Sequence, residues 1–193
     1  MIAKQTDSNP APSRTRRPAA FFDRDGVLNV DHGYVHRTEQ LEWVAGAPES
    51  VRLLNEAGYY VLVITNQSGV ARGFFDEAAV KAFHAHMQNV LAEKGAHIDA
   101  FYYCPHHPEG TVKAFAMACN CRKPRTGMLE QAARDWPIDI TRNFFIGDKD
   151  ADMVAAAAFK VRGIKFDARL HSLPDLVRQQ LATHKSPQGL SRL

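Results

Sequence analysis

Short apolar runs alternate along the chain with longer segments in which apolar residues recur at helical spacing. A continuous apolar run is typical of a strand buried on both faces of a parallel sheet, and the recurring pattern is typical of the helices that cover such a sheet. We expect strands at residues 19–23, 59–65, 100–103, 143–147 and 162–166, and helices at residues 47–58, 77–95, 127–136, 151–159 and 173–184, with Asp76 as the N-cap of the second helix. The pattern therefore predicts an α/β fold with a Rossmann-like parallel sheet flanked by helices.

Length and composition indicate a single domain. The chain has 193 residues, 45% of them hydrophobic, which is enough for one α/β domain with a full core. We expect this domain to span residues 19–183, between a disordered segment at residues 1–18 and a frayed end at residues 184–193. We expect the protein to be a monomer.

The net charge of +3 comes from residues 1–18, because the remaining residues carry equal numbers of basic and acidic side chains. A neutral folded part offers no basic surface for nucleic acid, so no nucleic-acid partner is expected. Residues 1–18 contain no apolar run, which argues against a secretory signal or a membrane-spanning segment there. We therefore expect a cytoplasmic protein with no membrane partner, whose three cysteines are reduced.

Acidic and hydroxyl side chains follow several of the expected strands at the point where each strand ends. Asp23 and Asp25 follow the first strand, Thr65 ends the second, and Asp148 follows the strand at residues 143–147. Ligands of open α/β sheets bind outside the carboxyl ends of the strands, so these side chains are expected to meet at one site. Nearby carboxylates repel each other unless a cation lies between them, and Mg²⁺ prefers such oxygen ligands. The alternative is that each aspartate only caps a turn or a helix.

All three cysteines lie in one loop, together with histidines. Cysteine and histidine are the usual ligands of a structural zinc ion, which binds four of them. The expected Zn²⁺ ligands are Cys104, His106, Cys119 and Cys121, with His107 as the alternative histidine. Ordinary buried cysteines are the competing interpretation. Arg122 and Lys123 follow directly, so a zinc ion bound by the loop 104–121 would fix the positions of two cations.

Four segments resemble, in order, the four motifs of the haloacid dehalogenase-type phosphatases. They are "DRDGVLN" from Asp23, "VITNQSG" with Thr65, "CRKP" with Lys123 and "GDKDAD" with Asp148, and the resemblance covers most of the chain. It implies a phosphatase with no large cap domain, in which Asp23 attacks phosphorus and forms an aspartyl-phosphate. It also implies that Asp25 is the general acid and base, and that Thr65 and Lys123 hold the phosphoryl oxygens. The implied Mg²⁺ ligands are Asp23, Asp25 and Asp148.

Within that superfamily, "NVDHGYVH", "TNQSGVARG" and "YYCPHHPEG" resemble a branch with a zinc loop. This branch contains the D-glycero-D-manno-heptose 1,7-bisphosphate 7-phosphatases of lipopolysaccharide precursor synthesis and the histidinol-phosphate phosphatases. The likeness to the heptose enzymes is stronger and implies a sugar bisphosphate as the substrate. The implied substrate-binding residues are Asp31, His32, Gly33, Tyr34, Asn66, Gln67, Ser68, Arg122 and Lys149. The likeness weakens after "AAAAFK", where the last strand and helix look shortened.

Several alternatives stay open at this point. Lys149 either contacts a phosphate or pairs with Asp23, and Asp152 either supports the site or caps a helix. A second phosphate on the substrate would give Arg122 a partner. This favours a heptose bisphosphate phosphatase over a histidinol-phosphate phosphatase. A zinc-dependent nucleic-acid-binding protein and a DNA 3'-phosphatase are also considered, and the neutral folded part disfavours both.

Overall fold

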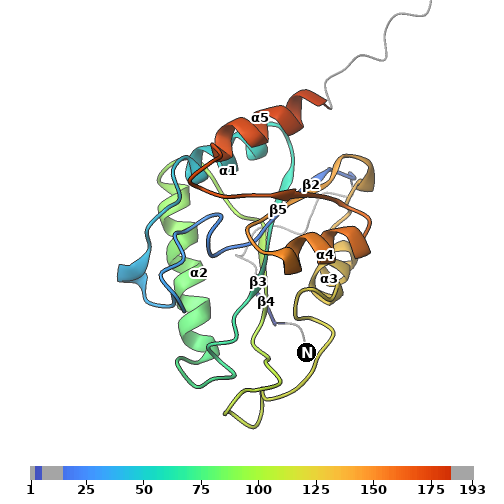
Figure 1. Ribbon diagram of the computed structural model, residues 1–193. Coiled ribbons are helices and arrows are strands. Elements are labelled where there is room, and N and C mark those ends of the chain that lie inside the picture. The colour runs from blue at the N-terminus through green and yellow to red at the C-terminus, as the bar shows by residue number, and fades with distance from the viewer. Residues whose placement is uncertain (1–2, 6–14, 184–193) are drawn as a thin grey trace, which may run out of the picture.

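The computed structural model describes residues 3–5 and 15–183, and in them one six-stranded sheet forms the centre of the fold (Figure 1). The strands lie in the order β1-β4-β3-β2-β5-β6. All neighbouring strands are parallel except β1 and β4, which are antiparallel. The strands are β1 (Ala3–Gln5), β2 (Ala19–Phe22), β3 (Tyr60–Asn66), β4 (Ala100–Cys104), β5 (Phe144–Gly147) and β6 (Arg162–Lys165).

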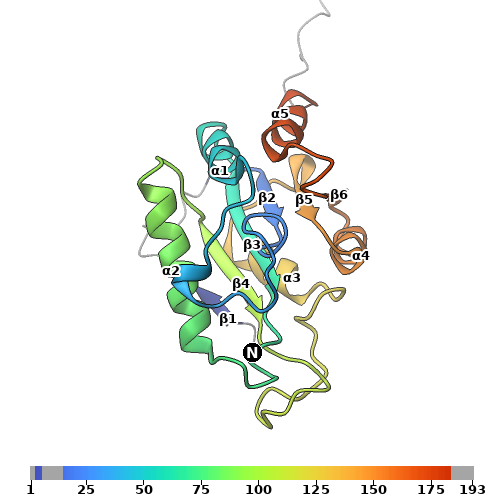
Figure 2. The ribbon, with the colours of Figure 1, turned by 60° about the vertical axis from the view of Figure 1, so that its left-hand side comes forward.

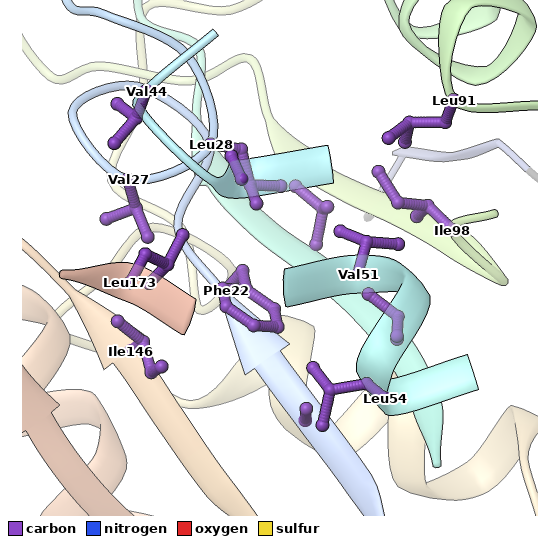
Figure 3. Close-up of a cluster of buried hydrophobic side chains, with 14 of the residues drawn as sticks. Phe22, Val27, Leu28, Val44, Val51, Leu54, Leu91, Ile98, Ile146 and Leu173 are labelled. Carbon is purple, nitrogen blue, oxygen red and sulfur yellow. The ribbon is translucent and has the colours of Figure 1, made fainter. Parts of the chain in front are cut away.

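Helices cover both faces of the sheet (Figure 2). One face carries α1 (Ala47–Glu56), α2 (Glu77–Ala92) and α5 (Leu173–Thr183), and the other carries α3 (Gly127–Asp135) and α4 (Asp150–Ala158). Two short 3-10 helices are η1 (Thr38–Gln40) and η2 (Ile140–Arg142). Successive strand residues point to opposite faces, so Phe22 packs in the core with α1 and α5 (Figure 3), whereas Phe21 packs in the core with α3 and α4.

The predicted strands and helices are all present, and their bounds differ from the expected ones by no more than three residues. The α/β fold with a parallel sheet is therefore confirmed. Asp76 is the N-cap of α2, where its side chain accepts a hydrogen bond of 2.8 Å from the Ala79 N–H. The helices found in residues 15–183 are all too short or too polar to span a membrane.

The first strand was not expected. Residues 3–5 belong to the segment 1–18 predicted to be disordered, yet they form β1 beside β4. The prediction is wrong for these residues, because β1 pairs with backbone groups of β4 that would otherwise form an open sheet edge. In the same segment, the Arg17 N–H donates to the Pro137 carbonyl at 3.1 Å. Residues 1–2 and 6–14, and the predicted frayed end at residues 184–193, lie outside the described residues.

The parallel strands bring three chain segments to one edge of the sheet. Phe22 at the end of β2 lies opposite Val63 of β3 and Ile146 of β5. The N–H of the next residue, Asp23, donates to the Ile146 carbonyl at 2.9 Å. The residues that follow β2, β3 and β5 therefore lie side by side, as expected for a site at the carboxyl ends of the strands.

Candidate active site

A buried ion pair joins the first residue after β2 to a lysine of the loop after β4. Asp23 and Lys123 are 5% and 3% exposed, and the Lys123 Nζ lies 2.9 Å from the Asp23 Oδ1. The same ammonium lies 2.6 Å from the Asp152 Oδ1 and donates to the Ile64 carbonyl at 2.7 Å. The Asn66 side chain accepts from the Lys123 N–H and donates to the Lys123 carbonyl. A cation held this firmly can neutralise the charge of a phosphoryl group bound at Asp23.

Asp148 and Asp152 add two carboxylates beside Asp23, and one oxygen of each residue lies within 4.8 Å of the others. Burial, together with the carboxylates of Asp23 and Asp152, raises the pKa of Asp148 to about 6, although Lys149 lowers it. The Asp148 Oδ1 is buried and accepts no hydrogen bond from residues 3–5 or 15–183. A divalent cation would relieve both the repulsion and the unsatisfied oxygen, so this acidic cluster could hold a metal ion.

Gly26 allows the Asp148 side chain to lie close to the turn after β2. Its φ is +84°, a backbone conformation that favours glycine. A Cβ atom at this position would lie 2.6 Å from the Asp148 Oδ2. The glycine of "DRDG" is therefore required both by the turn and by the carboxylate that packs against it.

Asp25 contacts a different set of groups from the acidic cluster. Its carboxylate accepts hydrogen bonds from the Arg24 guanidinium, from the Asn29 amide at 3.0 Å and from the Gln67 amide at 2.9 Å. The Asp25 carboxylate is not part of the acidic cluster, whose third member is Asp152. The Arg24 guanidinium lies 2.9 Å from the Asp25 Oδ2. The Mg²⁺-ligand role expected for Asp25 stays a prediction.

A cavity of about 270 Å³ opens beside Asp25. This volume is close to the lower end of the range for small-molecule sites, roughly 300 Å³. The lining residues are Asp25, Asp31, Gly33, Tyr34, Asn66, Gln67, Ser68, Gly69 and Lys149. They include seven of the nine residues expected to bind substrate, all except His32 and Arg122. The structure thus brings together three segments that are far apart in the sequence.

Lys149 contributes a cation to the wall of this cavity. Its Nζ lies 3.2 Å from the Asp31 Oδ2 and 3.9 Å from the Asp148 Oδ2. Burial alone would raise the pKa of Asp31, but the Gly33 N–H and the Lys149 ammonium outweigh it and lower the pKa. Of the two roles expected for Lys149, pairing with Asp23 is replaced by pairing with Asp31 and Asp148. Contact with a phosphate stays a prediction.

The remaining two expected substrate-binding residues lie outside that cavity. The His32 Nε2 lies 2.7 Å from the Glu42 Oε2. Arg122 lines a second cavity of about 220 Å³, together with Lys123 and residues of the cysteine loop. The Arg122 Nη1 is buried and has no hydrogen-bond partner among residues 3–5 and 15–183. A buried donor without an acceptor is costly, so this position suits an oxygen of a ligand.

The loop after β4 brings together the four expected zinc ligands. The Cys104 Sγ lies 3.5 Å from the Cys119 Sγ and 3.2 Å from the Cys121 Sγ, which lies 3.3 Å from the His106 Nδ1. Sulfur ligands of a tetrahedral zinc ion lie about 3.8 Å apart when the Zn–S bonds are about 2.3 Å, so small outward shifts would suffice. Contact with Cys104 lowers the pKa of Cys121 to about 5 despite burial. The cluster therefore favours a thiolate and could bind zinc.

His107, the alternative histidine, does not join this cluster. Its Nδ1 accepts a hydrogen bond of 3.1 Å from the Glu109 N–H, and its Nε2 lies 3.4 Å from an Arg72 nitrogen. His106 is the histidine that lies with the cysteines.

Sequence comparisons place the chain among phosphatases. A family model described as polynucleotide kinase 3 phosphatase matches residues 18–169. The D-glycero-beta-D-manno-heptose-1,7-bisphosphate 7-phosphatase of Rhodopseudomonas palustris is 51% identical over 155 residues, which cover 80% of this chain and 86% of the relative. The protein of that name from Escherichia coli K12 is 46% identical over 144 residues, 75% of each chain. The chain belongs to the heptose-1,7-bisphosphate 7-phosphatase family. It is therefore a haloacid dehalogenase-like phosphatase, an enzyme that hydrolyses phosphate monoesters.

Solved structures agree with this membership of the heptose-1,7-bisphosphate 7-phosphatase family. A HAD-like phosphatase from Mesorhizobium loti has a TM-score of 0.81 and 28% identity, covering 97% of this chain and 96% of that one. The D,D-heptose 1,7-bisphosphate phosphatase from B. bronchiseptica, in complex with magnesium and phosphate, has a TM-score of 0.72 and 29% identity, covering 86% of this chain and 99% of that one. The chain therefore shares both sequence and fold with phosphatases of this family.

Asp152 makes contacts that fit both of the roles expected for it. Its Oδ2 caps α4 by accepting a hydrogen bond of 3.0 Å from the Lys149 N–H, and its Oδ1 lies 2.6 Å from the Lys123 Nζ in the site. The contact of Arg24 was not expected, although its guanidinium donates to the Asp25 carboxylate. Alternation of side chains after a strand would point Arg24 away from its two neighbours, so the sequence pattern contains no signal for this contact.

Proposed function

We propose that this chain is a Mg²⁺-dependent phosphatase that removes the 7-phosphate of D-glycero-beta-D-manno-heptose 1,7-bisphosphate. It would act as a cytoplasmic monomer in the synthesis of nucleotide-activated heptose for lipopolysaccharide. The observation that carries the chemistry is the buried pair of Asp23 and Lys123, whose charged atoms lie 2.9 Å apart beside the acidic cluster. The substrate is inferred from the names of relatives that are 51% and 46% identical.

In the proposed reaction, Asp23 is the nucleophile. Its carboxylate oxygen attacks phosphorus in line, so an O–P bond forms while the bond from phosphorus to the sugar oxygen breaks. Asp25, which lines the cavity, gives a proton to the leaving sugar oxygen. Water then attacks the aspartyl-phosphate, Asp25 takes a proton from that water, and inorganic phosphate leaves free Asp23. Lys123 and the Thr65 hydroxyl hold the phosphoryl oxygens in both steps.

Asp23, Asp25 and Asp148 are the proposed Mg²⁺ ligands, and Asp152 lies close enough to Asp23 and Asp148 to join them. Bound Mg²⁺ supplies positive charge that neutralises and orients the phosphoryl group. The fit rests on Asp148, which combines a buried oxygen lacking a hydrogen bond from the described residues with a raised pKa. Both features are those of a carboxylate arranged for a cation.

Magnesium is expected to raise the melting temperature more at about pH 7.5 than at about pH 5. The pKa of Asp148 is raised from 3.8 to about 6. Protonated Asp148 therefore stabilises the metal-free fold. This stabilisation is fully present below the unfolded-state pKa of 3.8 and is lost as the pH rises through about 6. At the higher pH the ionised cluster destabilises the metal-free protein and attracts Mg²⁺, whereas at the lower pH a proton competes. Thermal unfolding with and without MgCl₂ measures this, and an equal or larger rise at the lower pH would contradict the Asp148 assignment.

We further propose that Zn²⁺ binds to Cys104, His106, Cys119 and Cys121. The purified protein should then contain about one zinc ion per chain, and this zinc should survive EDTA treatment that removes magnesium, because soft sulfur ligands prefer zinc. Elemental analysis measures both metals.

Cys121→Ser should lose zinc and melt at a lower temperature, whereas the control Met117→Ala on the same loop should keep its zinc. Zinc-free protein with full activity and an unchanged melting temperature would show that the cysteines have another role.

The proposed zinc ion would place Arg122 beside the catalytic lysine. The Arg122 Nη1 lacks a partner among the described residues, and the cavity it lines also contains His107 and Arg125. Burial and the guanidinium groups of Arg122 and Arg72 lower the pKa of His107, although Glu109 raises it. A planar guanidinium in such surroundings suits the second phosphate of a bisphosphate.

Arg122→Ala is expected to lower kcat/KM for the heptose bisphosphate by about 30- to 150-fold, which corresponds to about 2 to 3 kcal/mol. Histidinol phosphate has no second phosphate, so the loss on it should stay below about threefold. Lys113→Ala, which removes an exposed cation from the same loop, is the matched control and should change neither value. Equal fractional losses on the two substrates would refute binding of the second phosphate by Arg122. They would indicate that Arg122 only stabilises the loop.

Two competing substrates are less well supported. Histidinol phosphate would leave the Arg122 guanidinium without a phosphate to bind. A polynucleotide end, suggested by the description of the matching family model, would need a basic surface, whereas residues 19–193 carry no net charge.

A further inference from the structure

The buried side chain of Arg24 contacts Asp25, the proposed general acid and base. Arg24 is 0% exposed. Its Nε donates to the Asp25 Oδ1 at 3.2 Å, and its Nη2 donates to the Oδ1 at 3.0 Å and to the Oδ2 at 2.9 Å. A guanidinium that donates to both oxygens fixes the plane of the carboxylate as well as its position.

The same guanidinium ties Asp25 to the segments around the cavity. The Arg24 Nη2 also donates to the Val35 carbonyl at 2.7 Å and to the Gln67 Oε1 at 3.2 Å. The Gln67 amide in turn donates to the Asp25 Oδ2 and to the Thr65 Oγ1, both at 2.9 Å. Movement of Arg24 would therefore disturb the carboxylate and two loops together.

The imidazole of His84 in α2 contacts this guanidinium. Its Nε2 lies 3.2 Å from the Arg24 Nη1, and its ring stacks on Phe101 with the ring centroids 4.3 Å apart. An imidazole nitrogen can accept a hydrogen bond only when it carries no proton. Burial and the positive charge of Arg24 lower the pKa of His84, which agrees with a neutral ring. The Phe83 ring, 4.7 Å from the guanidinium carbon, covers Arg24 from the same helix.

We propose that Arg24, held by His84, is a positioning residue that aims the Asp25 carboxyl at the leaving oxygen of the substrate. This inference rests on the function proposed above, in which Asp25 protonates that oxygen. A purely structural role is the alternative, but a buried ion pair stabilises a fold no better than apolar side chains of similar volume. Several N–H groups of Arg24 donate to the Asp25 carboxylate, which lines the cavity. Such contacts hold a functional side chain in a fixed orientation.

The test compares His84→Phe and His84→Gln on two phosphate esters. Phenylalanine keeps a ring against Phe101 but removes the acceptor, whereas glutamine retains an acceptor. The heptose bisphosphate releases a sugar alkoxide that needs a proton, and p-nitrophenyl phosphate releases a phenolate that needs none. We expect His84→Phe to lower kcat/KM about tenfold or more on the sugar and less than about threefold on the aryl ester. His84→Gln should recover most of the loss, and His86→Phe on the same helix is the control.

Equal fractional losses on the two esters, or no loss on either, would overturn the proposal, because a structural role has no dependence on the leaving group. If His84→Phe does not fold, Arg24→Lys is used for the same comparison. Lysine keeps the positive charge but lacks the planar guanidinium that donates to both carboxylate oxygens. This variant should show the same dependence on the leaving group. A parent protein inactive on both esters would refute the proposed function itself, whereas an active parent with equal losses in the variants refutes only the role of Arg24 and His84.

Discussion

Replacing Asp23 with asparagine is expected to remove turnover and leave the fold intact. A neutral amide cannot form the aspartyl-phosphate, so kcat should fall by roughly 10⁴-fold or more. The fold should persist because asparagine has nearly the same shape, and because the change removes one of three carboxylates that lie within 4.8 Å of one another. Lys123 keeps a partner in Asp152 at 2.6 Å. Steady-state kinetics and thermal unfolding measure the two expectations.

The matched control for this change is Asp150→Asn. The Asp150 side chain is 98% exposed and pairs only with Lys165 among the salt bridges of the described residues, so its loss should leave kcat nearly unchanged. If Asp23→Asn retained activity within about tenfold of the parent, another group would have to be the nucleophile.

Lys123→Met is expected to have the second largest effect. Methionine has a similar length but no charge, so the phosphoryl oxygens and the Asp23 and Asp152 carboxylates all lose their cation. Removing one such electrostatic contact should lower kcat by about 10²- to 10³-fold. Removing one partner of a buried ion pair should also destabilise the fold by about 3 kcal/mol or more. Kinetics and denaturant unfolding with and without MgCl₂ measure both effects.

Lys165→Met provides the comparison, because it removes an exposed lysine that also pairs with an aspartate. It should change kcat and the free energy of unfolding little. A Lys123→Met protein as active and as stable as this control would mean that the buried lysine neither binds the phosphoryl group nor balances the acidic cluster.

The fold could be predicted because its elements have different hydrophobic periods. The run at residues 59–64 is continuously apolar, as expected for a strand buried on both faces, and it forms most of β3. Asp76 stands directly before a segment of helical period and caps α2. β1 could not be predicted, because its three residues have no such period and are held by pairing with the backbone of β4.

Much of the candidate site could also be predicted, since it depends on where strands end. Asp23 and Asp148 follow parallel strands and Thr65 lies near the end of a third, and the carboxyl ends of these strands share one edge of the sheet, so their proximity follows from the fold. The cysteine cluster could be recognised because four zinc-type ligands are concentrated in one loop.

The partners of individual charged groups could not be predicted, because side-chain direction is decided by tertiary contacts. Asp25 stands two residues after Asp23, yet a guanidinium from the residue between them occupies its oxygens. The third carboxylate of the acidic cluster comes instead from Asp152, which the turn after β5 and the start of α4 place beside Lys123. No spacing in the sequence distinguishes these two arrangements.

Phosphorus NMR of the reaction tests most directly whether the chain removes one particular phosphate from a heptose bisphosphate. The parent protein with MgCl₂ would be incubated with D-glycero-beta-D-manno-heptose 1,7-bisphosphate, and kcat/KM would be compared with that for fructose 1,6-bisphosphate, histidinol phosphate and a 3'-phosphorylated oligonucleotide. We expect the heptose bisphosphate to have the highest kcat/KM, and we expect the 7-phosphate signal to be replaced by that of inorganic phosphate while the anomeric phosphate signal stays. A product that has lost the anomeric phosphate, or a higher kcat/KM on any of the other three substrates, would contradict this expectation.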